Sequence, residues 1–469
     1  MSEYIPTIGL EIHAELATET KMFCSSLNDS HETRPNVNIC PVCMAHPGTL
    51  PVINKQAVLH VLRVGTALGG QLSDFSEFDR KNYFYPDIPK GFQISQYKYP
   101  LVSGGVLSGV LITRVHLEED TAKSFHLNGR RDTFLDFNRA GLPLMELVTE
   151  PCIRDSKQAV DFAKELQLLL RYLGASEANM EKGQMRVEAN VSVSKDPSKF
   201  GTKVEVKNLN SFRSVLQAID YEVKRQIELL SRGGLVIQET RGFDENTSKT
   251  FSQRLKESSH DYRYFPEPDL PKMKLRSVPE FQNLKDGLPE LPWTKRERLF
   301  NTYGLRAPAV AIFVNDLKLS DFFETVVKNH HDDKEFVLLA ANYITSDLVS
   351  LIGKEINIRP DNFEVLIVML QTGLISSRGA KDILTLMFKG EGGPRKIAEE
   401  RGLLQESDIP LLKNLAEGII RENEGVVSDY RSGKQTSLQF LVGQAIKKSK
   451  GSANPKIVQD IFKELLQHE

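Results

Sequence analysis

Apolar and ionisable residues alternate strictly over residues 10–16, which is the pattern of a β-strand with one buried face. Because successive strand side chains point to opposite faces, Glu11, His13 and Glu15 share one face, and the apolar residues share the other. The ionisable face is either solvated or one edge of a site. Its interpretation therefore depends on the other charged residues of the chain.

Further periodic segments follow in the first part of the chain. Helical spacing of apolar residues predicts helices, and strict alternation predicts strands. The helices lie at 54–68, 156–173 and 211–230, and the strands at 110–115, 185–193 and 202–206. Asn54 and Ser156 are the expected N-caps of the first two helices. Residues 78–97 contain two prolines and little periodicity, which predicts a long ordered loop.

Six prolines between residues 266 and 292 mark the end of a first domain. Beyond them the apolar spacing is helical, first at 334–352, 361–372 and 376–388, then at 407–420, 437–448 and 454–466. We therefore predict an α+β fold. It comprises a mixed α/β domain with an antiparallel sheet at 1–292, an all-helical domain at 293–406 and a small helical tail domain at 407–469.

The composition limits the class of protein but does not indicate a function. Of 469 residues, 40% are hydrophobic and 26% are charged, as in ordinary globular proteins. The net charge of -2 argues against a bulk electrostatic nucleic-acid binder, although a local basic patch is compatible with it. The chain has no apolar run long enough for a membrane span and no basic-then-apolar leader, so we expect a cytoplasmic protein.

Four cysteines in a chain of this length do not form a disulfide framework, so they are thiols or metal ligands. Cys40 and Cys43 form a Cys-x-x-Cys knuckle, and Cys24 is a plausible third zinc ligand. A closed zinc site needs a fourth ligand, for which His31 and His46 are candidates. The alternatives are a structural zinc site and a set of free thiols.

Several acids are embedded among apolar strand residues instead of lying in charged runs. They are Glu118, Glu119, Glu146 and Glu188. Each is either solvated or directed at something positive, because an unpaired buried carboxylate is costly. Together with Glu11 and His13 they supply oxygen and imidazole ligands suited to Mg²⁺ or Mn²⁺, ions that typically bridge nucleotide phosphates.

Cations that could contact phosphate are Lys81, Lys90, Arg139, Arg186 and Lys207, and the alternative for each is an ordinary surface charge. Neither a P-loop nor a Gly-x-Gly-x-x-Gly motif is present, so any nucleotide site is of another type.

Longer strings identify a family. They are GLEIH at 9–13, FDRKNYFYPD at 78–87, LEED at 117–120, FNRAGLPLME at 137–146, EVKNLNS at 205–211, DYRYFPEPDLP at 261–271, FLVGQA at 440–445 and ANP at 453–455. Together they resemble the B subunit of the bacterial tRNA-dependent amidotransferases that act on aspartyl- and glutamyl-tRNA(Asn/Gln). The resemblance covers essentially the whole chain.

The resemblance implies a cradle-like catalytic domain, a helical domain and a tail that grips tRNA. It implies a ligase that uses ATP and Mg²⁺ to phosphorylate the side-chain carboxylate of Glu on tRNA(Gln), Asp on tRNA(Asn), or both. Ammonia would come from a partner amidase subunit, and a small third subunit would complete a heterotrimer.

The resemblance also implies residue roles. Glu11, His13, Glu119 and Glu146 would be the catalytic metal-binding set, with Glu118 and Glu188 as further members. Lys81 and Lys90 would line the ammonia path. Arg139, Arg186 and Lys207 stay our candidates for cofactor phosphates. Relatives with a zinc knuckle have a Cys-x-Cys where this chain has Cys24-Ser25-Ser26, and others lack the cysteines, which puts zinc in question here.

Two other functions are compatible with the residues. A noncatalytic tRNA-recruiting scaffold would leave the acids solvated, and a metal-dependent phosphoesterase would act without tRNA or ammonia.

Overall fold

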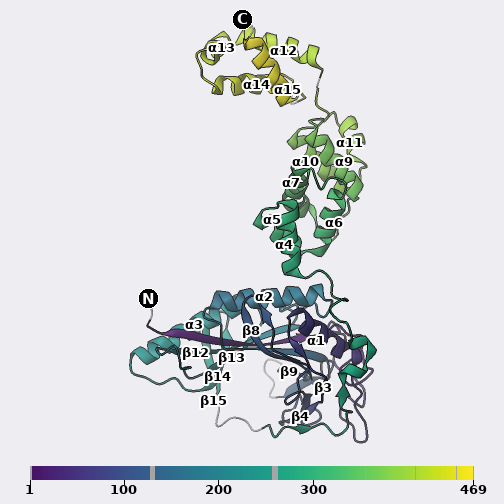
Figure 1. The fold of residues 1–469 in the computed structure, drawn as a ribbon, viewed down its shortest axis with the longest axis vertical. Helices are drawn as coiled ribbons and strands as arrows, with labels where there is room; N and C mark the ends of the chain where they lie inside the picture. Colours follow the sequence, from purple (N-terminus) through teal and green to yellow (C-terminus); the bar gives the residue numbers. More distant parts are fainter. Residues whose placement is uncertain are drawn as a thin grey trace. The chain divides into compact units, whose positions relative to one another are not determined.

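The structure, a computed structural model, describes residues 3–126, 132–255, 262–353, 355–406, 408–449 and 452–467. The chain divides into two compact units, Met1–Pro292 and Trp293–Glu469. Each unit is described by itself, and Figure 1 shows the elements of both.

Within the described residues, the first unit is built on a ten-stranded sheet with the order β15-β14-β13-β12-β1-β11-β8-β6-β2, and β7 pairs with β8. The strands are β1 (Ile5–Glu15), β2 (Gln71–Leu72), β6 (Val102–Ser103), β7 (Val106–Leu107), β8 (Val110–Glu119), β11 (Pro143–Thr149), β12 (Met185–Ser194), β13 (Val204–Leu209), β14 (Glu239–Asp244) and β15 (Lys249–Leu255). Neighbouring strands are antiparallel, except that β13 and β14 are parallel.

The central strand β1 lies between β11 and β12, and its apolar residues Ile8, Leu10, Ile12 and Ala14 are buried. The helices of this unit are α1 (Lys55–Ala67), α2 (Ser156–Tyr172) and α3 (Phe212–Ser231). Helices α2 and α3 lie along one face of the sheet (Figure 1). The apolar side chains of β1 point into the core, so its ionisable side chains point away from the core on the other face of the strand.

The helix starts agree with the predictions apart from one cap. Asn54 caps α1, as predicted, and its side chain accepts hydrogen bonds from Gln56 N and Ala57 N. The predicted cap Ser156 is wrong, because the cap of α2 is Asp155, which is extended and accepts from Gln158 N. Both residue types are good caps, so only the backbone conformation decides between neighbours.

The predicted loop at 78–97 is wrong in part, because it contains two short paired strands. Strands β4 (Asp79–Asn82) and β5 (Phe92–Ser95) are antiparallel, and β16 (Phe265–Pro266) pairs with the other side of β4. Four-residue strands are too short to show a clear period, and a partner nearly 190 residues away cannot be read locally. The smaller paired strands are β3 (Phe75–Ser76) with β17 (Met273–Lys274), and β9 (Lys123–His126) with β10 (Thr133–Asp136).

The second unit is helical. Its helices are α4 (Pro292–Tyr303), α5 (Ala307–Asn315), α6 (Leu317–Val327), α7 (Lys334–Tyr343), α8 (Val349–Leu351), α9 (Pro360–Gln371), α10 (Ser377–Phe388), α11 (Pro394–Glu400), α12 (Ile409–Glu422), α13 (Glu424–Arg431), α14 (Thr436–Lys448) and α15 (Pro455–Gln467). A π-helical turn at Ile344–Leu348 joins α7 to α8, and the short 3₁₀ turns Leu275–Ser277 and Pro279–Phe281 belong to the first unit. The α+β class is therefore confirmed.

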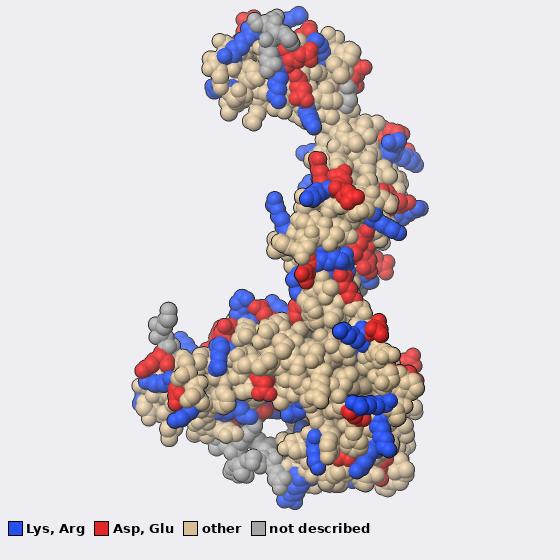
Figure 2. Space-filling view, viewed as in Figure 1, with Lys and Arg blue, Asp and Glu red and all other residues tan. Residues whose placement is uncertain are grey.

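The last four helices enclose their own core, which includes Leu412, Ile419, Leu441 and Phe462. On the face shown in Figure 2, basic and acidic side chains are interspersed, as the near-zero net charge indicates. None of the described helices has both the length and the apolar character that a membrane span requires.

Candidate active site

The ionisable face of β1 meets charged residues of three neighbouring strands. The strand register places His13 opposite Glu146 of β11, and Glu11 opposite Glu188 of β12. His116 of β8 lies opposite Glu146 in turn. Since directly paired residues project from the same face of a sheet, this register gathers the charged side chains into one array.

His13 is the centre of the array. Its Nε2 lies 3.2 Å from Glu118 Oε1, 3.4 Å from Glu146 Oε2 and 4.0 Å from Glu11 Oε1. Burial opposes the protonation of His13, but hydrogen bonds to Glu118 and Glu146 outweigh it and raise the pKa of His13 well above its usual value. Burial and the neighbouring Glu146 raise the pKa of Glu11 to about 7. The cluster therefore attracts positive charge.

His116 is a member of this array that sequence reasoning missed. It is buried, and its Nε2 lies 3.2 Å from Glu146 Oε2. Burial raises the pKa of Glu146, but His116 and His13 outweigh it and hold that pKa well below its usual value. The signal was present, because His116 and Glu118 are two residues apart on one strand and so share a face.

We expected Glu119 in the main metal-binding set and Glu118 as a further member, but the structure places Glu118 in the array instead of Glu119. Glu118 lies beside His13, whereas Glu119 is bonded elsewhere: its Oε2 accepts a hydrogen bond from Lys90 Nζ at 2.6 Å and its Oε1 accepts one from Ile94 N at 2.9 Å. Adjacent strand residues point to opposite faces, so both cannot join one cluster on the sheet. The structure does not bring Glu119 to His13.

A second acidic group extends the array toward β13. Lys207 Nζ lies 3.0 Å from Glu188 Oε2 and 3.5 Å from Glu205 Oε1. Burial lowers the pKa of Lys207, but Glu188 and Glu205 outweigh it and raise that pKa above its usual value. Glu205 was not among the predicted site residues, although it precedes Lys207 by one strand period.

Arg139 and Arg186, predicted to contact phosphate, are paired within the protein. Asp120 Oδ2 accepts a hydrogen bond from Arg139 Nη2 at 2.6 Å, and Asp120 Oδ1 accepts one from Arg186 Nη2 at 3.0 Å. Glu15, which shares its strand face with Glu11 and His13, is buried and lies 2.9 Å from Arg139 Nη2. Burial raises the pKa of Glu15 to about 7. The four residues form one ion network beside the array.

The two predicted ammonia-path lysines lie at different places. The Lys81 ammonium is 5.1 Å from the ring centroid of Tyr262 and 5.8 Å from that of Tyr83. Burial lowers the pKa of Lys81, but Glu118 is the first of the charges that raise it above its usual value. Lys90 lines a cavity of about 230 Å³ together with Glu119. Of these two lysines, Lys81 is the one whose charge interacts with an acid of the array, Glu118.

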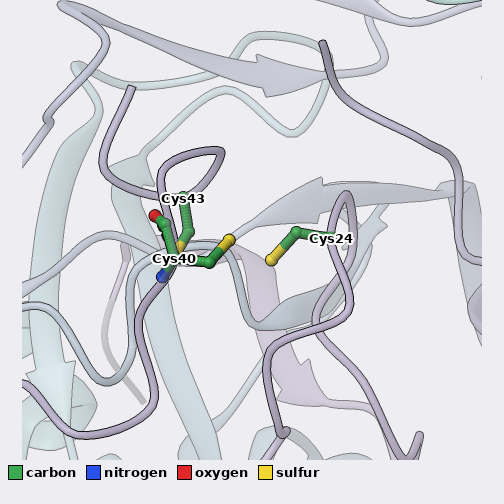
Figure 3. A group of neighbouring side chains, drawn as sticks. All are labelled: Cys24, Cys40 and Cys43. Atoms are coloured by element: carbon green, nitrogen blue, oxygen red, sulfur yellow. Dashed lines mark hydrogen bonds between the residues drawn. The ribbon is translucent and has the colours of Figure 1, made fainter. Parts of the chain in front are cut away.

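The three knuckle cysteines converge, as Figure 3 shows. The sulfur atoms of Cys24, Cys40 and Cys43 all lie within 4.8 Å of one another. Neither candidate fourth ligand, His31 or His46, belongs to this group of described residues. The structure therefore brings neither histidine to the three sulfurs.

The array contains donors for a divalent metal. Among the described residues, ligand atoms lie within 4.8 Å of one another in three acidic groups: Glu11, His13 and Glu146; His116, Glu118 and Glu146; and Glu11, Glu188 and Glu205. Carboxylate oxygens with one imidazole suit a hard cation such as Mg²⁺ or Mn²⁺. The donor set therefore fits the predicted metal chemistry, with Glu118 in place of Glu119.

The sheet unit with its acidic array is the part of the chain that defines its class. Residues 6–278 match the family described as the GatB/GatE catalytic domain, and residues 321–466 match the GatB domain. The chain thus pairs a catalytic domain with the accompanying helical domain.

Full-length relatives show the particular family. The chain is 40% identical to the B subunit of aspartyl/glutamyl-tRNA(Asn/Gln) amidotransferase from Crocosphaera subtropica, with 99% of this chain and 98% of that protein covered. The B subunits of the same enzyme from Persephonella marina and Moorella thermoacetica are each 42% identical, with 99% of this chain and 100% of each relative covered. The chain belongs to the family of amidotransferase B subunits, which confirms the resemblance.

Proposed function

We propose that this chain uses ATP to phosphorylate the side-chain carboxylate of Glu on tRNA(Gln), of Asp on tRNA(Asn), or of both, and that ammonia then displaces phosphate to form the amide. The relatives carry aspartyl/glutamyl-tRNA(Asn/Gln) in their names. A free carboxylate reacts poorly with ammonia until one oxygen becomes part of a good leaving group. The observation that carries the proposal is the convergence of Glu11, His13, Glu118 and Glu146 on one sheet face.

Residue roles follow from this geometry. Glu11, His13, Glu118 and Glu146 would hold Mg²⁺, with Glu188 as a further member on the neighbouring strand. The ion, when bound, offsets charge on the transferring phosphoryl group. His13 and His116 fix the orientation of Glu146 from two sides.

The remaining proposed roles, contact with phosphate and passage of ammonia, belong to cationic side chains of the first unit. All three proposed phosphate contacts are paired with acids, and Lys207 is the best placed of them because its partners Glu188 and Glu205 belong to the array itself, whereas Arg139 and Arg186 bind Asp120 beside it. Lys81, which lies among tyrosines and whose charge interacts favourably with that of Glu118, would direct ammonia toward the activated carboxylate. Lys90 and Glu119 would lie earlier on that path, along their shared cavity.

Partners follow from the proposed chemistry. An amidase subunit would supply ammonia, a small third subunit would complete the heterotrimer, and the tail from residue 407 would bind tRNA in the cytoplasm. We also propose that Cys24, Cys40 and Cys43 hold Zn²⁺, since their sulfurs converge and soft thiolates favour this ion.

Replacing Glu146 tests the proposal. Glu146→Gln removes a charge that two imidazoles and the metal would share, so we expect ATP-dependent carboxylate phosphorylation to fall by at least about 100-fold while tRNA affinity is unchanged. His13→Ala should behave alike. The matched control is Glu181→Gln, a change of an exposed glutamate just before β12, which should be neutral. Undiminished phosphorylation in both Glu146→Gln and His13→Ala would falsify the proposal.

A scaffold without catalysis is distinguished by the tail. Deleting residues 407–469 removes a region with its own core, so the sheet unit should keep its array. We expect weaker tRNA binding and unchanged basal ATP hydrolysis. A scaffold would show no ATP hydrolysis in either form of the protein.

A further inference from the structure

The cysteine cluster has a buried lysine beside it. Lys21 is fully buried, and its Nζ lies 3.8 Å from Cys43 Sγ and donates to Phe137 O at 3.2 Å. Among the described residues, no carboxylate lies within 4.0 Å of this ammonium. A buried ammonium without a negative partner is costly, so the cysteine cluster is the group beside Lys21 that can supply the compensating charge.

The protein donors of the cluster are three sulfurs. Ligand sulfurs around tetrahedral zinc lie about 3.8 Å apart, given Zn–S bonds of about 2.3 Å, and the three sulfurs here are within 4.8 Å of one another. Within the knuckle, Cys43 Sγ accepts a hydrogen bond from Cys40 N at 3.1 Å and donates one to Cys40 O at 3.4 Å, which holds the turn closed. Ser26 Oγ lies 3.9 Å from Cys43 Sγ, on the segment that also carries Cys24.

The cluster is also open to solvent on one side. Cys24 and Cys43 line the cavity of about 230 Å³ whose wall further includes His46, Lys90 and Glu119. A small ligand in this cavity can therefore reach two of the three sulfurs. Zinc sites with three protein ligands and one exchangeable position are the reactive kind, whereas closed four-ligand sites are structural.

We propose that this chain binds Zn²⁺ through Cys24, Cys40 and Cys43 alone, that the fourth position beside Ser26 takes an exchangeable ligand from the cavity, and that Lys21 supplies the balancing charge. Three thiolates and one Zn²⁺ sum to one negative charge, and the Lys21 ammonium brings the buried group to neutrality. This inference rests on the zinc part of the proposed function and not on the amidation chemistry.

Cobalt substitution tests the ligand count. Co²⁺ loaded into the full chain should give a sulfur-to-metal charge-transfer band of three-thiolate intensity, and Ser26→Cys should raise that intensity in the ratio of four thiolates to three. The matched control is Ser25→Cys, an exposed neighbouring position, which should leave the band unchanged. Added 2-mercaptoethanol should shift the band of the native chain but not that of Ser26→Cys. A native band that ignores the added thiol, or no charge-transfer band at all, would overturn the proposal.

Replacement of Lys21 tests the charge balance. Lys21→Met keeps an unbranched side chain that is one atom shorter and removes the ammonium, so we expect Zn²⁺ affinity, measured by competition with a chelator, to fall about 10- to 100-fold with the three-thiolate band retained. Unchanged affinity would refute the role of Lys21. If Lys21→Met does not fold, the cobalt and thiol measurements still decide the open position. Failure of zinc binding with normal ATP-dependent amidation would reject this inference and leave the proposed enzyme intact.

Discussion

The ion network around Asp120 gives a prediction whose size follows from burial. Asp120 is 6% exposed and binds the guanidinium groups of Arg139 and Arg186 through its two oxygens. Asp120→Asn keeps the shape and removes the charge, so two partly buried cations lose their common partner. Removing one member of a buried ion pair costs about 3–5 kcal/mol. Because both arginine side chains retain some exposure, we expect the free energy of unfolding to fall by about 3 kcal/mol at neutral pH.

The pH dependence has a definite sign. Burial alone would raise the pKa of Asp120, but Arg186 and Arg139 outweigh it and hold that pKa below its usual value. A depressed pKa in the folded state means that the carboxylate stabilises fully above the unfolded pKa of about 3.9, and that this contribution is lost as the pH falls through the folded value. The difference between native and Asp120→Asn should therefore be present at neutral pH and shrink below about pH 4, where Asp120 itself becomes protonated.

Urea unfolding followed by circular dichroism measures the effect, and the fluorescence of Trp293, the single tryptophan, follows the second unit as an internal reference. The control is Asp161→Asn, which removes an exposed partner of Lys157 and should leave the unfolding free energy unchanged. A loss below about 1 kcal/mol for Asp120→Asn would refute the argument from burial. If the two arginines serve ATP instead, the variant would raise the KM for ATP without loss of stability.

Three further predictions test the site and the packing. Glu118→Gln should weaken Mn²⁺ binding at least about 10-fold, whereas Glu119→Gln, on the opposite side of the strand, should leave Mn²⁺ binding unchanged. Calorimetric titration measures both, and equal effects of the two variants would contradict the site geometry. Gly65→Ala should lower the unfolding free energy by about 1–3 kcal/mol, because the added Cβ would lie 2.4 Å from Val102 Cγ2, while Gly418→Ala in the open face of α12 should stabilise by up to about 1 kcal/mol. Phe462→Ala, in the core of the last four helices, should cost about 3–5 kcal/mol and make residues 409–467 sensitive to limited proteolysis with ATP hydrolysis retained; a protease-resistant tail would refute this.

Local sequence patterns predicted much of the secondary structure of the first unit. Alternation in β1 and β12 and helical spacing in α1 and α3 are set by short-range geometry, since one buried face imposes its period on neighbouring residues. The local pattern did not predict β4 and β5, because four-residue strands are too short to show a period, and it did not predict the pairing of β4 with β16, because these segments are nearly 190 residues apart.

The sequence by itself determined the family, through long strings, and the types of residue that the chemistry needs. Only the tertiary structure decided which of them meet. Strand order placed β1 between β11 and β12, and register set His13 against Glu146. Because side chains alternate along β8, His116 and Glu118 lie on the face of the array, whereas Glu119 points to the other face, where it binds Lys90. Strand order and register are fixed by packing across the whole sheet, so no local pattern contains them.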